Sequence, residues 1–366
     1  MNKRIISLCL SFVLLLCLLP AAPTAAAAGD VAINETNFPD DIFRSYVSGN
    51  FDQNGDGILS PAEIEIVTHM SCSDFGIASL KGIEYFTAMK TLYCGHNQLT
   101  SLDVSGCTAL EELYCFNNQL TSLDVSKNTA LKKLLCYYNQ LTALDVSRNT
   151  ALEYLDCTIN QLTSLDVSKN TALESLSCFN NQLTSLDVSK NTALERLSCF
   201  NNQLTALDVS KNTALKKLLC DYNQLTALDV SRNTALTNLY CTENRLTALD
   251  VSRNTALQWL SCGRNQLTAL DVSKNTKLVD EDGHAAGFVD DAGELAQGLA
   301  HEAGLESHEG ISHFAVNWLQ PQYSVSSAEQ PLTSSDVSPL LWQFRCSSAV
   351  FLLTSRDVSW LRLQSR

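Results

Sequence analysis

The chain has 366 residues, of which 45% are hydrophobic and 17% are charged, and its formal net charge is -14. An acidic chain without a stripe of Lys and Arg has nothing to neutralise phosphates, so nucleic acid is excluded as an expected partner. A chain of this length would ordinarily hold about two domains.

Residues 1–28 have the composition of a secretory signal peptide. Lys3 and Arg4 precede an apolar core at residues 5–19, and residues 21–28 offer small-residue cleavage sites. No later stretch is apolar and long enough to span a bilayer. We therefore expect a secreted, extracellular protein with no membrane span and no anchor.

Residues 29–75 predict a helix–loop–helix. Pro39 lies in the first turn of the first expected helix, and Asn37 is the candidate N-cap. Apolar residues then recur at helical spacing from Ile42 to Phe51. Because the first coil of a repeat array exposes an apolar edge, we interpret this segment as an N-terminal cap.

The loop between the two helices has oxygen-bearing residues at the spacing of an EF-hand calcium loop, with a glycine at the sharp turn. The expected Ca²⁺ ligands are the side chains of Asp52, Asn54, Asp56, Ser60 and Glu63 and the carbonyl of Ile58. An alternative is that residues 60–63 simply form a capping box for the second helix. The loop resembles dockerin-like or EF-hand caps of bacterial secreted proteins. A lone loop implies structural Ca²⁺ with a weak affinity, on the order of 0.1–1 mM.

From residue 76 to residue 279 one phrase returns every 21 residues, after a divergent entry repeat at 77–92. The repeated cysteines are Cys94, Cys115, Cys136, Cys157, Cys178, Cys199, Cys220, Cys241 and Cys262. A fixed period of this length predicts a solenoid.

The phrase L-x-x-L-x-C-x-x-N-x-L resembles the leucine-rich repeat, with Cys in the third apolar position. Its nested halves resemble the short-repeat class of secreted bacterial proteins, and the entry repeat looks like that of internalins. The resemblance implies a leucine-rich repeat solenoid with short parallel β-strands in each coil. We expect the strand near Leu113–Cys115 and a second strand at Leu123–Val125.

Three further columns accompany the leucines. The nine cysteines are expected to be reduced core thiols with parallel side chains. Asn118 and its equivalents are expected to turn inward and pair buried backbone groups. Asp124 and its equivalents, each followed three residues later by Lys or Arg, are interpreted as a solvated charge ladder. A row of calcium ions is the alternative, but the glycine-rich phrase of β-rolls is missing.

The second half of each repeat hardly varies, whereas the positions flanking the Leu-x-Cys strand do. Aromatic residues at those positions predict a ligand-binding face for an extracellular protein or glycan. They are Tyr93, Tyr114, Phe116, Tyr137, Tyr138, Tyr154, Phe179, Phe200, Tyr222, Tyr240 and Trp259. The alternative is that aromatic neighbours merely favour strand formation.

The periodic pattern stops at Val279, and the sequence leaves open whether residues 280–366 fold or are disordered. We expect a non-catalytic, monomeric binding or adhesion protein. An enzyme with its site in residues 280–366 and a passive spacer are the alternatives. No nucleophile–base pair with recognisable spacing supports the enzyme.

Overall fold

The computed structural model describes residues 29–279, which fall into two compact units with described parts at 29–149 and 150–279. The expected signal peptide at 1–28 lies outside the described residues, and so does the region 280–366 with its alternative of a catalytic site. The described part of the chain contains no helix that is long and apolar enough to cross a membrane.

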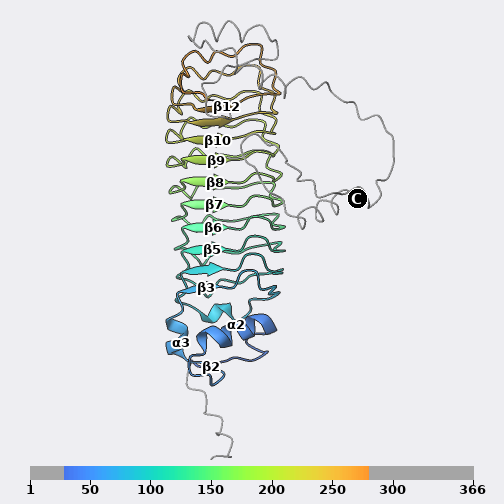
Figure 1. Ribbon diagram of the computed structural model, residues 1–366, viewed down its shortest axis with the longest axis vertical. Coiled ribbons are helices and arrows are strands. Elements are labelled where there is room, and N and C mark those ends of the chain that lie inside the picture. Colours follow the sequence, from blue (N-terminus) through green and yellow to red (C-terminus); the bar gives the residue numbers. More distant parts are fainter. Residues whose placement is uncertain (1–28, 280–366) are drawn as a thin grey trace, which may run out of the picture. The chain divides into compact units, whose positions relative to one another are not determined.

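The first unit begins with the predicted helical cap (Figure 1). Helix α2 spans Asp41–Phe51, and helix α3 spans only Pro61–Glu65. Between them, strand β2 (Ile58–Leu59) pairs antiparallel with strand β1 (Val31–Ala32). Phe38, Phe43, Val47 and Leu59 are fully buried, so the cap has its own apolar core.

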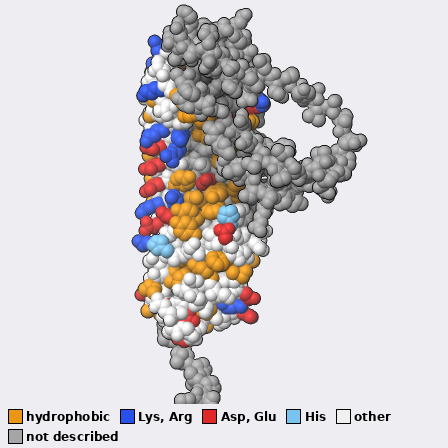
Figure 2. All heavy atoms as spheres, in the orientation of Figure 1, with side chains coloured by type: hydrophobic (Ala, Val, Ile, Leu, Met, Phe, Trp, Pro, Cys, Tyr) orange, Lys and Arg blue, Asp and Glu red, His pale blue; other side chains and the backbone are white. Residues whose placement is uncertain are grey.

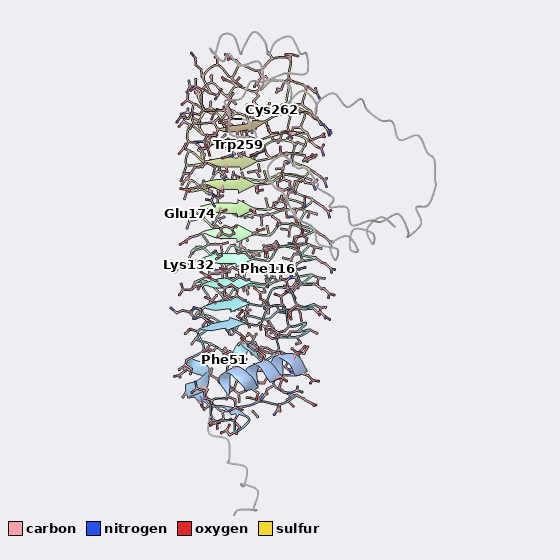
Figure 3. The ribbon with its side chains drawn as sticks, in the orientation of Figure 1. Phe51, Phe116, Lys132, Glu174, Trp259 and Cys262 are labelled. Atoms are coloured by element: carbon pink, nitrogen blue, oxygen red, sulfur yellow. The ribbon has the colours of Figure 1, made fainter. Side chains whose placement is uncertain are left out.

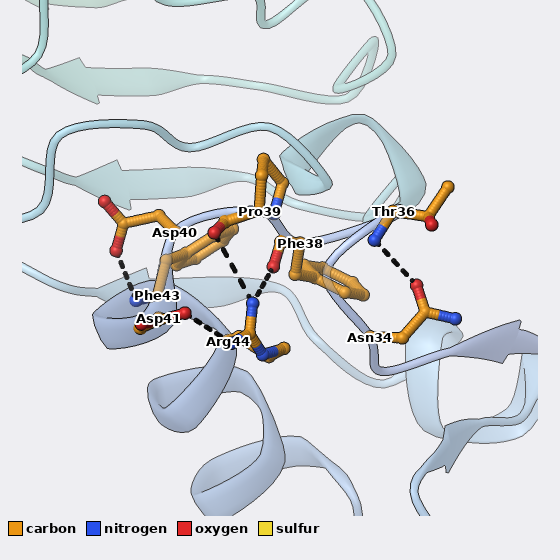
Figure 4. Close-up of polar contacts among 8 residues, drawn as sticks. All are labelled: Asn34, Thr36, Phe38, Pro39, Asp40, Asp41, Phe43 and Arg44. Atoms are coloured by element: carbon orange, nitrogen blue, oxygen red, sulfur yellow. Dashed lines mark hydrogen bonds and ion pairs between the residues drawn. The ribbon is translucent and has the colours of Figure 1, made fainter.

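Helix α2 begins three residues later than the sequence suggests. The N-cap is Asp40, whose carboxylate accepts a hydrogen bond from the backbone N–H of Phe43 (Figure 4). The prediction that Asn37 is the N-cap is wrong, because its side chain serves the preceding turn. The Asn37 amide donates to the Ala32 carbonyl, and its oxygen accepts from the Tyr85 hydroxyl. Arg44 closes the first turn of the helix by donating to the Phe38 carbonyl and pairing with Asp41.

The rest of the first unit is a stack of coils, each with one three-residue strand. The register is strict, because the central leucines Leu92, Leu113 and Leu134 align from strand to strand. The entry coil also contains the 3-10 helix η1 (Ile83–Tyr85). The parallel strands of this unit are β3 (His69–Ser71), β4 (Thr91–Tyr93), β5 (Glu112–Tyr114) and β6 (Lys133–Leu135).

The second unit repeats the same coil with the same 21-residue register (Figure 1). Its strands are β7 (Tyr154–Asp156), β8 (Ser175–Ser177), β9 (Arg196–Ser198), β10 (Lys217–Leu219), β11 (Asn238–Tyr240) and β12 (Trp259–Ser261). The predicted fold class is therefore confirmed: a parallel-strand solenoid with nine cysteine-bearing coils, from β4 to β12. Each strand lies one residue earlier than expected, with the leucine at its centre and the cysteine just after it.

The core consists of columns of identical side chains. In the coil of β5, Leu113, Cys115 and Leu120 are all 0% exposed, and the same holds for their equivalents up to the coil of β11. The eleven described cysteines are all thiols, and Cys262, in the last described coil, is the one that is not fully buried. Burial raises the pKa of the Cys115 thiol to about 12, so these thiols stay protonated as small apolar groups.

The inward asparagines perform the predicted backbone pairing. The side-chain amide of Asn118 donates to the carbonyls of Cys94 and Cys115, and its oxygen accepts the N–H of Leu99. A second asparagine column, not recognised in the sequence, bridges coils in the other half of the repeat. Asn128 there is fully buried and donates to the carbonyls of Val104 and Cys107.

The predicted second strand at Leu123–Val125 is wrong. Among the described residues this side of the coils shows only an isolated bridge between Asp103 and Asp124. The aspartates use their carboxylates locally: that of Asp124 accepts the N–H of Ser126 at 2.8 Å. Such a turn competes with strand pairing. The same bond is the first cause of the lowered pKa of Asp124, and the charge of Lys127 contributes less.

Candidate functional site

The predicted calcium loop is held in shape by its own carboxylates. Asp52 accepts the N–H groups of Gly55 and Gly57 at 2.8 and 3.0 Å, and Asp56 accepts that of Ile58 at 2.9 Å. Gly55 and Gly57 both have positive φ, at 72° and 80°, which a residue with a Cβ rarely adopts. The loop therefore turns sharply and gathers the side chains of the first three expected ligands on one side.

The short antiparallel pairing of β1 and β2 orients the carbonyl of Ile58. The N–H of Ile33 donates to the Gly57 carbonyl, and Ala32 lies opposite Ile58. Because hydrogen-bonded and non-bonded positions alternate in antiparallel strands, the N–H and C=O of Ile58 point away from β1. This leaves the Ile58 carbonyl available to the loop.

Glu63 is the residue whose position decides how the loop works. Its side chain is 7% exposed and accepts the N–H of Gln53 and the N–H and hydroxyl of Ser60. These bonds to Ser60 lower the pKa of Glu63 and complete the capping box of α3. No three His, Cys, Asp or Glu side chains within residues 29–279 converge as a metal site. The all-oxygen donor set suits Ca²⁺, but chelation would require Glu63 to exchange its bonds to Ser60 for the metal.

The second candidate site is the outer face of the strands. Counted from the coil cysteine, the variable side chains occupy four columns, at positions -3, -1, +1 and +2. The predicted aromatic residues are spread over all four columns and do not form one strip. Three of them, Tyr93, Tyr138 and Tyr222, are more than a third exposed, and the other eight are half-buried.

In the first unit these rings form a connected surface. Tyr93 and Tyr114 stack with ring centroids 4.3 Å apart, and Phe116 and Tyr137 stack at 4.6 Å. Tyr138 meets the edge of Tyr137 at 6.0 Å. The predicted residues of this unit are thus brought together, and the stacks explain why most of the rings are only half-exposed.

Polar groups border this surface. His96 meets the edge of Phe116 at 5.2 Å, the Tyr114 hydroxyl donates to Glu112 at 2.8 Å, and the Lys133 ammonium lies 5.7 Å from the Tyr114 ring. Burial and the neighbouring Glu112 raise the pKa of Tyr114, so its hydroxyl stays a donor.

In the second unit the rings are less continuous. Phe179 and Phe200 stack at 4.1 Å with an interplanar angle of 12°. Tyr154 and Trp259 open strands β7 and β12, Tyr240 ends β11, and Tyr222 follows β10. The structure therefore groups one pair of the predicted residues here and distributes the other four along the face.

One backbone position in each coil has a left-handed conformation. Tyr138 and Tyr222 have φ values of 52° and 51°, and even the β-branched Ile159 has a φ of 50°. Non-glycine residues adopt this region at a cost, which the inward asparagine one position later offsets by fixing the bend. The bend turns this +2 side chain outward, where Tyr138 is 45% exposed.

A charged edge borders the strand face at the start of the strands (Figure 2). Glu111 lies between Lys90 and Lys132, with nitrogen–oxygen distances of 3.3 and 2.8 Å, and Lys216 pairs with Glu195 at 2.7 Å. Figure 3 shows Lys132 at this end of the strands and Phe116 at the other. The aromatic surface is therefore separated from the charged edge by the width of the strands.

Asp221 is not singled out by the sequence pattern, although it lies in the same column as Phe179 and Phe200. Its carboxylate accepts the N–H of Thr242 at 2.8 Å. Burial raises the pKa of Asp221 to about 6. Only its alignment with the aromatic column, read at the 21-residue period, could have drawn attention to it.

The coils, the parallel strands and the asparagine column define a leucine-rich repeat protein of the internalin-like type. Residues 68–128 and 171–212 match the family model described as Leucine Rich repeats (2 copies). The chain is 43% identical over 86 residues to Internalin J of Listeria monocytogenes serotype 4b (strain F2365), a match covering 24% of this chain and 9% of that protein.

Two solved structures are similar. The functional domain of InlJ from Listeria monocytogenes, which includes a cysteine ladder, aligns with a TM-score of 0.66 and 41% identity, over 70% of this chain and 57% of that one. The internalin inlF from Listeria monocytogenes aligns with a TM-score of 0.57 and 24% identity, over 68% of this chain and 82% of that one. The chain thus spans only part of Internalin J, and the likeness to inlF concerns the fold alone.

Proposed function

We propose that this chain is a secreted, non-catalytic binding protein that recognises an extracellular protein or glycan through the outer face of its strands. The proposal rests chiefly on the connected aromatic surface of the first unit, formed by Tyr93, Tyr114, Phe116, Tyr137 and Tyr138. Aromatic side chains with a polar tip give large contact areas at small entropic cost, which is why they are enriched in recognition surfaces.

The uniform side of the coils supports the same proposal by contrast. The turns around Asp124 repeat almost unchanged and use their carboxylates for local hydrogen bonds. Variation is concentrated on the strand face, where side chains can change without disturbing the asparagine and cysteine columns. The similar proteins described above are internalins, and adhesion is the role we infer for this chain by similarity.

The test compares two double variants of the full chain on arrays of surface proteins and glycans. In Tyr114→Ser/Phe116→Ser the centre of the aromatic surface is removed, and we expect at least tenfold weaker binding to any hit of the unaltered chain. The control is Lys127→Ser/Arg148→Ser on the uniform side, which should bind like the unaltered chain. Equal loss in both variants, or no loss in the first, would contradict the proposed face.

We further propose that the loop from Asp52 to Glu63 takes up a structural Ca²⁺ ion. The oxygen donors of Asp52, Asn54 and Asp56 and the carbonyl of Ile58 would hold it, and Glu63 would close the site. Because the β1–β2 pairing and both helices meet at this loop, the ion would fix the cap against the entry coil. The capping box of Ser60 and Glu63 accounts for the same residues without metal, and calcium titration separates the two.

A further inference from the structure

Two coils of this chain are identical in sequence except at one residue. Residues 130–152 and 214–236 differ only where Tyr137 of the first is replaced by Asp221 in the second. The difference falls in the +1 column of the strand face. A single exchange within an otherwise unchanged copy makes this position the natural place to look for a specific contact.

In the first unit, the tyrosine in this position continues an aromatic stack. The rings of Phe116 and Tyr137 are 4.6 Å apart and inclined by only 5°. In the second unit the preceding rings, Phe179 and Phe200, stack in the same way. The stack cannot continue, because the next side chain in the column is the carboxylate of Asp221.

The register places Asp221 directly beside Phe200. Strands β9 and β10 pair with an offset of 21 residues, and the N–H of Asn201 donates to the Asp221 carbonyl at 2.9 Å. One face of the Phe200 ring lies on Phe179, and the opposite face is directed along the column toward Asp221. A ring face and a carboxylate are therefore adjacent on the binding side of the coil.

We propose that Phe200 and Asp221 form a subsite for a cationic side chain, Arg or Lys, of a protein partner. A cation placed there meets the negative face of the ring and the carboxylate together, and both attract it. The proposal rests on the binding role of the strand face and specifies one chemical feature of the partner.

The electrostatic surroundings of Asp221 favour such a ligand. Its carboxylate is largely buried and accepts one backbone N–H, from Thr242. Desolvation raises the pKa of Asp221 to about 6, so an incoming cation gains a carboxylate that water stabilises poorly. The ionisable groups on its own and the adjacent coils are Arg196, Cys199, Lys217, Cys220, Tyr222, Tyr240, Cys241 and Glu243, and Glu243 is paired with Arg264.

The test uses N-acetyl-arginine methylamide as the probe and the neutral citrulline derivative as its isostere. Binding to the full chain is followed through the carboxyl carbon signal of Asp221 in protein labelled at aspartate. We expect the arginine probe alone to shift this signal. Its affinity should fall about tenfold from pH 7.5 to pH 5.0, because about a tenth of Asp221 is then ionised.

Three variants complete the test, with the arginine probe followed by chemical shifts of neighbouring backbone amides. Asp221→Asn and Asp221→Tyr should each lose about tenfold in affinity, and Asp221→Tyr restores the sequence of a coil that already exists in this chain. Asp208→Asn, on the uniform side, is the control for general attraction to an acidic protein and should bind as before.

Equal binding of the citrulline derivative, or unchanged affinity in Asp221→Asn and Asp221→Tyr, would overturn the subsite. Failure of the Tyr114→Ser/Phe116→Ser experiment with a normal result here would instead count against the aromatic surface of the first unit. The two proposals therefore fail separately.

Discussion

Phe116 lies so close to the backbone of Gly95 that a Cβ atom at position 95 would come within 2.8 Å of the ring carbons Cε2 and Cζ. Real Cβ atoms do not approach carbon this closely, so glycine at 95 is what allows Phe116 to lie over the preceding coil and stack on Tyr137. Contact between coils, and not the strand alone, therefore sets the position of this ring.

Gly95→Ala should displace the Phe116 ring and destabilise the protein by about 1–3 kcal/mol. The same change in a Phe116→Ala background should cost much less, because the clash is then gone. Thermal and urea unfolding of the two single variants and the double variant measure the coupling. Gly49→Ala is the control: it has no neighbour within 4 Å and lies in helix α2, so it should stabilise slightly. Equal costs in both backgrounds would show that Phe116 does not need Gly95.

Asn202→Ala should destabilise the solenoid by about 2–4 kcal/mol, because several buried backbone groups lose their partners at once. The Asn202 amide donates to the carbonyls of Cys178 and Cys199, and its oxygen accepts the N–H of Leu183. Its neighbour Asn201 is exposed and left-handed, with φ at 51°, so Asn201→Gly should be nearly neutral. Comparable urea midpoints for both variants would contradict the buried role of the asparagine column.

Calcium should stabilise the cap. At 10 mM Ca²⁺ and an affinity of about 1 mM, the expected gain is about 1.4 kcal/mol, seen as a higher Tm than in chelator. Glu63→Gln should abolish the gain, whereas Glu65→Gln, exposed on the same short helix, should keep it. Melting curves that coincide with and without Ca²⁺ would leave the capping box as the whole role of Ser60 and Glu63.

Asp221→Asn should stabilise the protein at pH 8 and have no such effect at pH 4. The folded-state pKa of about 6 is above the usual value of an aspartate, so protonated Asp221 fits the fold and the ionised form opposes it. The stability that wild-type keeps near pH 4 is lost as the pH rises to about 6. The difference between variant and wild-type should therefore grow over that window to at most about 3 kcal/mol. Urea unfolding at several pH values measures it, and a flat difference would refute the raised pKa.

The period of the sequence was sufficient to predict the coil, because Leu113, Cys115 and Asn118 each repeat every 21 residues and their burial follows from stacking. It was not sufficient for features that depend on the side chain in the adjacent coil. The stack of Phe116 on Tyr137 and the carboxylate beside Phe200 are contacts of this kind. The start of helix α2 was also misjudged, since Asn37 and Asp40 are both good caps and only tertiary contacts choose between them.

Thiol-specific labelling should distinguish the last described coil from the others. Cys115 and its equivalents are fully buried, whereas Cys262 is partly exposed. Peptide mapping after brief treatment with a maleimide under native conditions should find Cys262 modified well before Cys115, and Cys262→Ser should leave Cys115 as slow as before. Rapid modification of the whole column would contradict the packing of the coils.

Every backbone bond between coils joins residues about 21 positions apart, as between Cys199 and Leu219. Excising one complete unit, such as residues 193–213, would therefore join Thr192 to Ala214, a Thr-Ala step that every coil already has, in unchanged register. The array would be shorter by one rung. Nearly identical DNA copies invite such unequal exchange. Length, and with it the number of side chains offered to a partner, is thus a quantity that this architecture can vary in whole steps without inventing a new fold.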